Sequence, residues 1–366
     1  MLGWTALAIV LIDLLVGSLF SRSHQARTLS GLTRYFEFGR SAEGTVNLAV
    51  GMTDATTDPE YIDFLSGSLT EEAVAPLPRE PRHRDSRLIA IYGMSFSAHV
   101  ARALEQAGPD VTVRSLVAAS APPSHSYARY EFDRHRHEAD VAVLSILAGT
   151  VPYTLTMTGM TWGVEQPFPY MYPRYFVADG KLGSVSPLIT GPADLRAARQ
   201  DRTRWEQFVE QVRRHDAYYS ALAFRQSPAD HSVLMRLLRR ALAQHHVRKI
   251  KQSIHDQSGF DSESETARVL RRMVSQFAQS AREDGVMPIV LLLHDQGYDD
   301  HLFALLEPLL ESEQIPYVST HTICPATDTS NFVPDGHFTA DASRLIAAEI
   351  PKRIDEHSAE GLTAAR

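Results

Sequence analysis

Five short apolar runs are the feature that most limits what this chain of 366 residues can fold into. They are nearly continuous in aliphatic residues, the pattern of strands that are buried on both faces of a sheet. The runs lie at 88–92, 111–118, 141–147, 287–293 and 315–319, and helical patterns lie at about 98–107, 124–138, 262–283, 299–312 and 339–355. Because strands and helices alternate, we predict an α/β fold with a parallel sheet covered by helices on both faces.

A long interval at about 151–260 interrupts this alternation, and we interpret it as a partly helical insertion. Its first part is rich in aromatic residues among prolines and glycines, and its second part, 194–255, has helical spacing and basic stretches. The aromatic residues are Trp162, Phe168, Tyr170, Tyr172, Tyr175 and Phe176. Such rings either stack on sugars as a lid or form a small core, and we expect the core because nothing in the sequence requires their exposure.

The N-terminal stretch differs in kind from the rest of the chain. Residues 2–20 carry no charge except that of Asp13, and the run is about long enough to cross a bilayer as a helix. We therefore expect a transmembrane anchor over 1–21. A cleaved signal peptide is the alternative, with Gly17 and Ser18 near a cleavage site, but no Lys or Arg precedes the apolar run.

The chain divides into four parts by composition. In order, we expect the anchor at 1–21, a linker with a helix at 22–86, a body at 87–355 that carries the insertion, and a flexible tail at 356–366. Within the linker, helical spacing at 28–39 predicts the helix, and the Pro-, Glu- and Arg-rich stretch at 67–87 predicts an exposed loop.

Charge and residue usage exclude several classes of function. The net charge of −8 and the isoelectric point near 6.0 argue against a nucleic-acid partner. The single cysteine, Cys324, can form neither an internal disulfide nor a cysteine-based metal site. Two histidine pairs, His135 with His137 and His245 with His246, lie among arginines, so we expect solvated helix faces rather than metal ligands. For His294 and Asp295, we expect a structural loop.

Two segments far apart in the sequence carry side chains suited to nucleophilic catalysis. Ser95 follows the first apolar run in a glycine-containing turn and precedes a helical pattern, while Asp335 and His337 precede the last helix. A serine hydroxyl is a poor nucleophile unless an imidazole takes its proton, and a carboxylate must orient that imidazole. Because the carboxyl ends of parallel strands share one sheet edge, we expect Ser95, Asp335 and His337 to form a catalytic triad there.

These residues resemble the motifs of the SGNH hydrolases, also called GDSL-like lipases or acylhydrolases. Gly93, Met94 and Ser95 stand in the G-D-S positions, and Asp335 with His337 stands in the last block, where the usual D-x-x-H is shortened to D-x-H. The resemblance covers about 87–150 and 285–355. It implies a three-layer, flavodoxin-like fold and ester hydrolysis or acyl transfer without a metal or organic cofactor.

The resemblance also implies an oxyanion hole, in which this chain departs from the family. The family's glycine after the second strand has no glycine counterpart, and Ser120 is the nearest match. The family's asparagine after the third strand falls near Gly149, with Thr150 as the neighbouring donor. We therefore expect the backbone N–H groups of Ser95 and Ser120, with Thr150, to bind the oxyanion.

The expected function is that of an SGNH-type ester hydrolase or O-acyltransferase that acts on an acyl ester. The substrate that the resemblance suggests is an acetyl ester on a cell-surface or exported polysaccharide. The alternatives are a catalytically silent SGNH-like domain that binds glycan or scaffolds an envelope assembly, and a helix-rich interaction protein whose two segments lie apart. The family favours a periplasmic or extracellular body, whereas the arginines that follow the apolar run favour an inward-facing one. These are Arg22, Arg27, Arg34 and Arg40.

Overall fold

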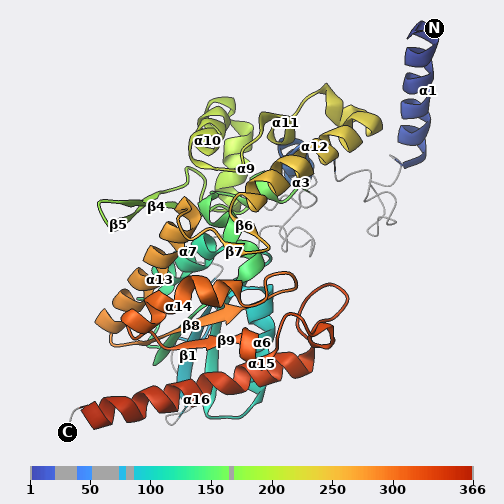
Figure 1. Cartoon of the computed structure of the whole chain (residues 1–366). Coiled ribbons are helices and arrows are strands. Elements are labelled where there is room, and N and C mark those ends of the chain that lie inside the picture. The colour runs from blue at the N-terminus through green and yellow to red at the C-terminus, as the bar shows by residue number, and fades with distance from the viewer. Residues whose placement is uncertain (1, 21–38, 52–73, 80–85, 165–168, 365–366) are drawn as a thin grey trace. The chain divides into compact units, whose positions relative to one another are not determined.

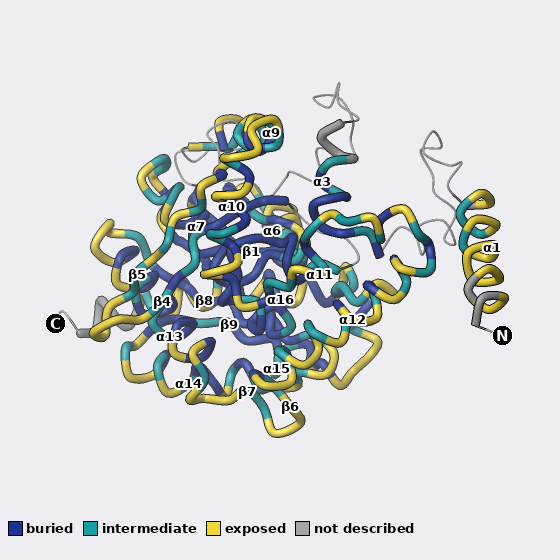
Figure 2. The backbone as a smooth tube through the Cα atoms, turned by 90° about the horizontal axis from the view of Figure 1, so that it is seen from above, coloured by how far each residue is buried: buried dark blue, intermediate teal, exposed yellow. Residues whose placement is uncertain are grey.

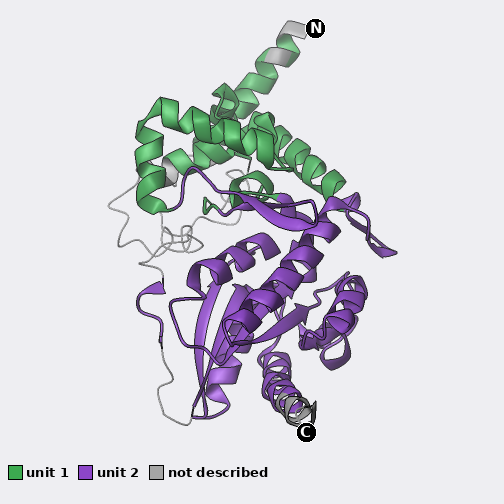
Figure 3. Ribbon diagram, turned by 90° about the vertical axis from the view of Figure 1, so that its left-hand side faces the viewer, with its two compact units in different colours: residues 1–65, 156–171, 191–251 green, residues 66–155, 172–190, 252–366 purple. Residues whose placement is uncertain are grey.

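The structure, a computed structural model, describes residues 2–20, 39–51, 74–79, 86–164 and 169–364 (Figure 1). The chain forms two compact units, each built from segments that are distant in the sequence (Figure 3). Unit 1 comprises Met1–Leu65, Thr156–Met171 and Gly191–Lys251, and unit 2 comprises Ser66–Leu155, Tyr172–Thr190 and Gln252–Arg366. The expected insertion is therefore divided: residues 156–171 and 191–251 belong to unit 1, whereas residues 151–155, 172–190 and 252–260 belong to unit 2.

Unit 2 is built on a five-stranded sheet in which every pairing is parallel, as the sequence predicted. Its strands are β1 (Arg87–Met94), β2 (Val111–Ala118), β3 (Val141–Leu147), β8 (Met287–Leu293) and β9 (Tyr317–Ser319). They lie in the order β2-β1-β3-β8-β9, the strand order of flavodoxin-like folds. Strand β1 therefore lies between β2 and β3, and its carboxyl end lies at the point where the strand order reverses.

Helices cover both faces of this sheet (Figure 1). On one face, α6 (Ser95–Gln106) contacts β1 and β2, and α16 (Ala340–Ala364) contacts α6 and β9. On the other face lie α7 (Pro123–Asp133), α13 (Glu265–Glu283) and α14 (His301–Ser312), and α7 and α13 contact each other. The short elements η2 (Ala148–Leu155), α15 (Thr320–Ile323) and η4 (Thr329–Asn331) lie in the connections. All five expected helices form, and α16 continues through most of the stretch that was expected to be a flexible tail.

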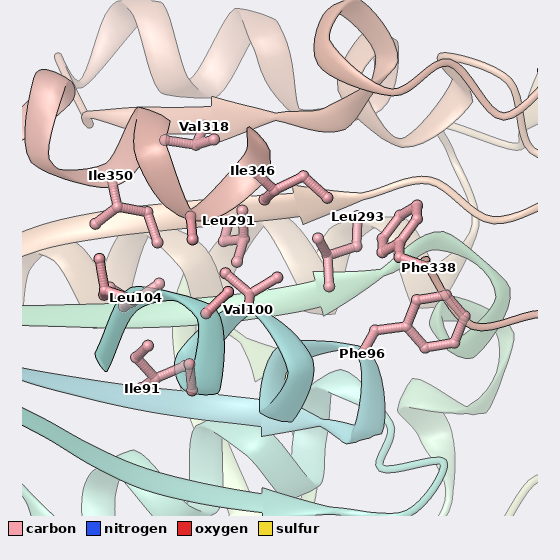
Figure 4. Packing of buried hydrophobic residues seen from close by; sticks show 14 of the residues in the cluster. Ile91, Phe96, Val100, Leu104, Leu291, Leu293, Val318, Phe338, Ile346 and Ile350 are labelled. Atoms are coloured by element: carbon pink, nitrogen blue, oxygen red, sulfur yellow. The ribbon is translucent and has the colours of Figure 1, made fainter. Parts of the chain in front are cut away.

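Aliphatic side chains fill the space between the sheet and the α6–α16 layer (Figure 4). Ile91 and Leu291 point from the strands, Val100 comes from α6, and Ile346 and Ile350 come from α16, all fully buried. A fully buried side chain of this size contributes about 1.5–3 kcal/mol relative to an exposed one. This packing fixes α6 and α16 against the sheet, and it thereby fixes the residues that lead into both helices.

Two small antiparallel hairpins complete unit 2. They are β4 (Arg174–Ala178) with β5 (Lys181–Val185), and β6 (His255–Asp256) with β7 (Gly259–Phe260). Between β4 and β5, Asp179 and Gly180 both have positive φ, of 50° and 71°. An Asp-Gly pair in this conformation is the favoured two-residue hairpin turn, because its twist matches that of the strands.

The regular elements in the described residues of unit 1 are helices. They are α1 (Leu2–Phe20), α3 (Ala42–Gly51), α8 (Gly159–Trp162), α9 (Pro192–Gln200), α10 (Arg202–His215), α11 (Ala221–Phe224), η3 (Pro228–His231) and α12 (Val233–Gln252). Buried polar contacts join them: the Trp205 indole donates to Glu43, and Asp230 accepts from Ser41 and pairs with Arg239. Because each buried charge has a partner, these helices can pack closely without unsatisfied carboxylates.

The N-terminal expectations have mixed outcomes. Residues 2–20 form the helix α1, which is largely exposed (Figure 2). The expected transmembrane anchor is not found, because no helix in the described part of the chain is both long enough and apolar enough to cross a membrane. The helix expected at 28–39 lies outside the described residues, except for its last position.

The expected burial is confirmed for four of the six aromatic residues, which are divided between the two units, whereas Phe176 is only half-buried. Trp162 and Tyr170 are buried in unit 1, and Tyr172 and Tyr175 are buried in unit 2. Phe168 lies outside the described residues. Rings that the protein covers cannot stack on a sugar, so these four residues do not form a glycan-binding lid.

Candidate active site

The turn that carries Ser95 is formed by close packing under the end of β1. At Gly93, a Cβ atom would lie 2.2 Å from Ser97 Oγ and 2.9 Å from Ser145 Cβ, so only glycine fits there. The Ser97 hydroxyl in turn donates to Ser145 Oγ at 2.7 Å and accepts from the Met94 N–H at 3.2 Å. This buried network fixes the backbone from which Ser95 projects.

Ser95 is the first residue of α6 and is partly exposed. Met94 occupies the N-cap position, and its sulfur accepts from the Phe96 N–H at 3.2 Å. A thioether is a weak acceptor, so Met94 caps the helix less strongly than the family's Asp would. The position at a helix N-terminus places Ser95 among free N–H groups, which favour negative charge.

A tight turn delivers Asp335 and His337. The Gly336 N–H donates to the Val333 carbonyl at 2.9 Å, and the Val333 N–H donates to the His337 carbonyl at 2.8 Å. Gly336 has a φ of +89°, in the left-handed region that glycine adopts without strain. The sequence Pro334-Asp335-Gly336 is a turn signal of this kind. The segment is therefore a closed turn immediately before α16, in line with its expected place.

The structure brings the three expected catalytic side chains together. His337 Nε2 lies 2.8 Å from Ser95 Oγ, and His337 Nδ1 lies 3.1 Å from Asp335 Oδ1. The same carboxylate oxygen accepts the His337 backbone N–H at 3.1 Å. In this arrangement Nε2 can accept the serine proton while Nδ1–H donates to the carboxylate, the geometry that nucleophilic catalysis by serine requires.

The triad lies at the surface of unit 2. The Asp335 side chain is 70% exposed and that of His337 is 26% exposed. The hydrogen bond from the His337 backbone, followed by that from its side chain, lowers the pKa of Asp335. The carboxylate therefore stays ionised throughout the neutral range and remains an acceptor for Nδ1–H.

Strand register places Ser120 at the same sheet edge as Ser95. Met94 pairs with Ala118, so β1 and β2 end side by side and the two serines follow directly. Ser120 has a φ of 52°, a left-handed conformation in which glycine is common. A glycine would adopt this conformation without strain. The Ser120 backbone N–H is a candidate oxyanion donor.

The third expected donor is already engaged. The Thr150 hydroxyl is buried and donates to the Leu147 carbonyl at 2.8 Å, and the Gly149 N–H donates to Asp295 Oδ1 at 2.8 Å. A Cβ at Gly149 would lie 2.2 Å from Asp295 Oδ2. A carboxylate therefore occupies the space that a side chain at residue 149 would need, and the Thr150 hydroxyl is directed to the Leu147 carbonyl in this structure.

Two rings beside the triad were not anticipated. The Phe96 and His337 rings lie 4.6 Å apart at 31°, and the His99 and His337 rings lie 5.2 Å apart at 29°. Phe96 also contacts Phe338 edge to face (Figure 4). The available signal was helical spacing, because His99 follows Ser95 by four residues and so lies on the same face of α6.

The expectation of a solvated face is wrong for His137. Its side chain is 2% exposed and lies 2.7 Å from the Tyr92 hydroxyl and 3.3 Å from Asp133 Oδ2. Arg114 and Asp133 form a buried ion pair next to it. The partner His135 is exposed, with 71% of its side chain accessible. A histidine in an arginine-rich stretch is thus buried against a phenol from β1 and against the carboxylate of Asp133, four residues earlier at the end of α7.

His294 has a structural role, as expected. It is fully buried and lies 3.2 Å from Thr320 Oγ1 through Nδ1, while Nε2 accepts the Phe303 N–H. Burial, followed by the nearby His321, lowers the pKa of His294 to about 3. It therefore remains neutral at physiological pH and ties β8 to α14.

Comparison with models of known protein families finds no match for this chain, and comparison with curated proteins finds none either.

Proposed function

We propose that this protein is a serine-dependent enzyme that hydrolyses or transfers an acyl group held in an ester. The observation that carries the proposal is the contact of 2.8 Å between Ser95 Oγ and His337 Nε2, two residues separated by 242 positions in the sequence. A serine that only capped a helix would not need an imidazole at its hydroxyl, nor a carboxylate behind that imidazole.

In the proposed reaction, His337 Nε2 removes the proton from Ser95 as Oγ attacks the ester carbonyl. Asp335 holds the Nδ1–H tautomer and stabilises the imidazolium that forms. The backbone N–H groups of Ser95 and Ser120, with the N-terminus of α6, stabilise the oxyanion. His337 then protonates the leaving alcohol, and water or an acceptor hydroxyl releases the acyl group from Ser95.

The substrate class rests on the resemblance to SGNH hydrolases. The proposed substrate is an acetyl ester on a cell-surface or exported polysaccharide, and transfer to a sugar hydroxyl would use the same triad. Because a lost oxyanion donor costs about 10²- to 10³-fold in turnover, the engaged Gly149 and Thr150 predict a slow or specialised enzyme.

The proposal is tested by the release of acetate from an aryl acetate and from an acetylated oligosaccharide. Ser95→Ala and His337→Ala should each lower kcat by about 10³- to 10⁴-fold, because members of a triad act as a unit. His135→Ala is the matched control, since that histidine is exposed and remote from the serine in sequence. Equal activity in the Ser95→Ala variant would contradict the proposal.

A second candidate is a catalytically silent domain that binds glycan. The engagement of the Gly149 N–H by Asp295 and of the Thr150 hydroxyl by Leu147 favours it, because both remove donors from the oxyanion hole. Folded wild-type protein that binds an acetylated oligosaccharide but releases no acetate from it would support this candidate and overturn the first.

A further inference from the structure

The general base of the proposed triad is held mainly from one side. The Asp335 carboxylate that should orient His337 is 70% exposed, so water competes for it. A hydrogen bond to an exposed charge is weakened by solvent, so the contact with Asp335 at Nδ1 orients the imidazole only in part. Something besides Asp335 must keep Nε2 directed at Ser95.

Helix α6 supplies two rings that meet the imidazole. The ring of His99 lies nearly parallel to that of His337, with centroids 5.2 Å apart at 29°, and Phe96 contacts the same imidazole at 4.6 Å and 31°. Phe96 is buried, and its packing against Phe338 is part of the hydrophobic core (Figure 4). Stacked rings of this kind define a plane, which a lone hydrogen bond does not.

The charge of His99 suits a ring stacked on a catalytic base. Burial is the largest cause that lowers the pKa of His99, and the positive charges of His337 and Arg102 lower it further. A hydrogen bond with the Phe338 backbone and the charge of Asp335 raise this pKa, but by less. These groups come from α6 itself and from the turn before α16 that packs against it. His99 is therefore neutral at physiological pH, so it does not repel the imidazolium that His337 becomes when it takes the serine proton.

We propose that His99 is a positioning residue whose ring, stacked on His337, keeps the general base in the orientation that faces Ser95. The inference rests on the proposed function, because it concerns the same triad. His99 itself transfers no proton and touches no reacting atom. From α6, the helix that also carries Ser95, its ring helps to orient the His337 imidazole, which the exposed Asp335 carboxylate orients only in part.

Two substitutions distinguish the role of the His99 aromatic ring from the role of its ionisable nitrogens. His99→Phe keeps an aromatic ring and removes the nitrogens, and His99→Ala removes the stack. We expect His99→Ala to lower kcat by about 3- to 10-fold with KM unchanged, the range of one aromatic contact, and His99→Phe to stay within about 2-fold of wild type. Arg102→Ala is the control on the same helix, because it changes the charge near His99 but not the stack.

An NMR readout does not depend on turnover. The ¹⁵N shifts of His337 should report the Nδ1–H tautomer in wild type and in His99→Phe, and a mixture of tautomers in His99→Ala. If wild-type protein releases no acetate, the proposed function fails while the tautomer comparison still decides the role of His99. Unchanged kcat and tautomer in His99→Ala would overturn the inference. A loss of kcat in His99→Phe as large as that in His337→Ala would also overturn it, because His99 would then take part in proton transfer.

Discussion

Two aspartate–histidine pairs of unit 2, Asp133 with His137 and Asp335 with His337, differ mainly in what surrounds them. Asp133 and His137 are buried, with 0% and 2% of their side chains exposed, and Asp133 is paired with Arg114. Asp335 and His337 are 70% and 26% exposed, and the histidine faces Ser95. The same two residue types therefore form a buried structural network in one place and, in the proposed function, act in catalysis in the other. The Arg114 guanidinium compensates the charge of the buried Asp133, whereas the second pair lies in a surface turn beside the Ser95 hydroxyl.

The buried pair is fully satisfied by its neighbours. Asp133 accepts two hydrogen bonds from the Arg114 guanidinium and one from the Tyr92 hydroxyl. Burial raises the pKa of Asp133, but the hydrogen bonds from Arg114 and His137 outweigh it and hold the pKa well below the usual range. No proton is available at neutral pH from this carboxylate, so the network joins β1, β2 and α7 rather than acting on a substrate.

The largest expected effect is on stability. Asp133→Ala should lower the free energy of unfolding by about 3–5 kcal/mol, because it leaves the Arg114 charge buried without its partner. Asp335→Ala is the matched control: the same change at an exposed site should alter stability by no more than about 0.5 kcal/mol. Urea denaturation of both variants measures the difference. Equal losses would show that burial does not distinguish the two pairs.

A third buried carboxylate, that of Asp216 in unit 1, extends the comparison. It accepts hydrogen bonds, but no cationic side chain among the described residues pairs with it. Asp216 accepts from the Met157 and Tyr218 N–H groups and the Thr161 hydroxyl. Burial raises its pKa to about 6, although these hydrogen bonds act in the opposite direction. Because the folded state holds the proton more tightly than the unfolded state, stability should fall by about 3 kcal/mol as pH rises from about 4 to above 6.

The two buried carboxylates should therefore give opposite pH dependences. The stabilisation that Asp133 provides is present above about pH 4, the unfolded value, and is lost as acid protonates it. The three tryptophans of the chain, Trp4, Trp162 and Trp205, all belong to unit 1, so their fluorescence reports the unfolding that Asp216 controls. Asp216→Asn should flatten that profile between pH 4 and 7, and an unchanged slope would refute this assignment.

The exposed pair is tested by a substitution that keeps its shape. Asp335→Asn should lower kcat by about 10²-fold, less than in a buried triad, because an exposed carboxylate contributes less to orienting the imidazole. Asp328→Asn is a close control, since Asp328 is also exposed and accepts the N–H two residues on, that of Ser330. If both variants lose activity equally, the effect belongs to turn geometry and not to the triad.

Much of unit 2 could be predicted because its signals are local. The apolar runs at 111–118, 141–147 and 287–293 match β2, β3 and β8 in both bounds. Strand β9 is shorter than expected and begins at Tyr317, after Pro316, which has no N–H to donate to a ladder. Ser95, Asp335 and His337 could be grouped because parallel strands bring their carboxyl ends to one edge.

The rest depends on contacts between residues that are far apart in sequence. The burial of His137 requires Tyr92, which lies 45 positions away in β1, as well as Asp133, which lies four residues earlier in the same stretch. The engagement of Gly149 by Asp295 joins residues separated by 146 positions, through the register in which Leu147 pairs with Leu293. The division of the insertion between two units likewise follows from tertiary packing and not from composition.

Labelling with a fluorophosphonate, followed by mass spectrometry of the modified peptide, tests the central claim most directly. An activated serine reacts with this probe, whereas a serine that only begins a helix does not. We predict a single adduct on Ser95 in wild-type protein, lost in Ser95→Ala and in His337→Ala and retained in His135→Ala. Folded wild-type protein that remains unlabelled, or that is labelled equally after His337→Ala, would contradict a catalytic triad at this site.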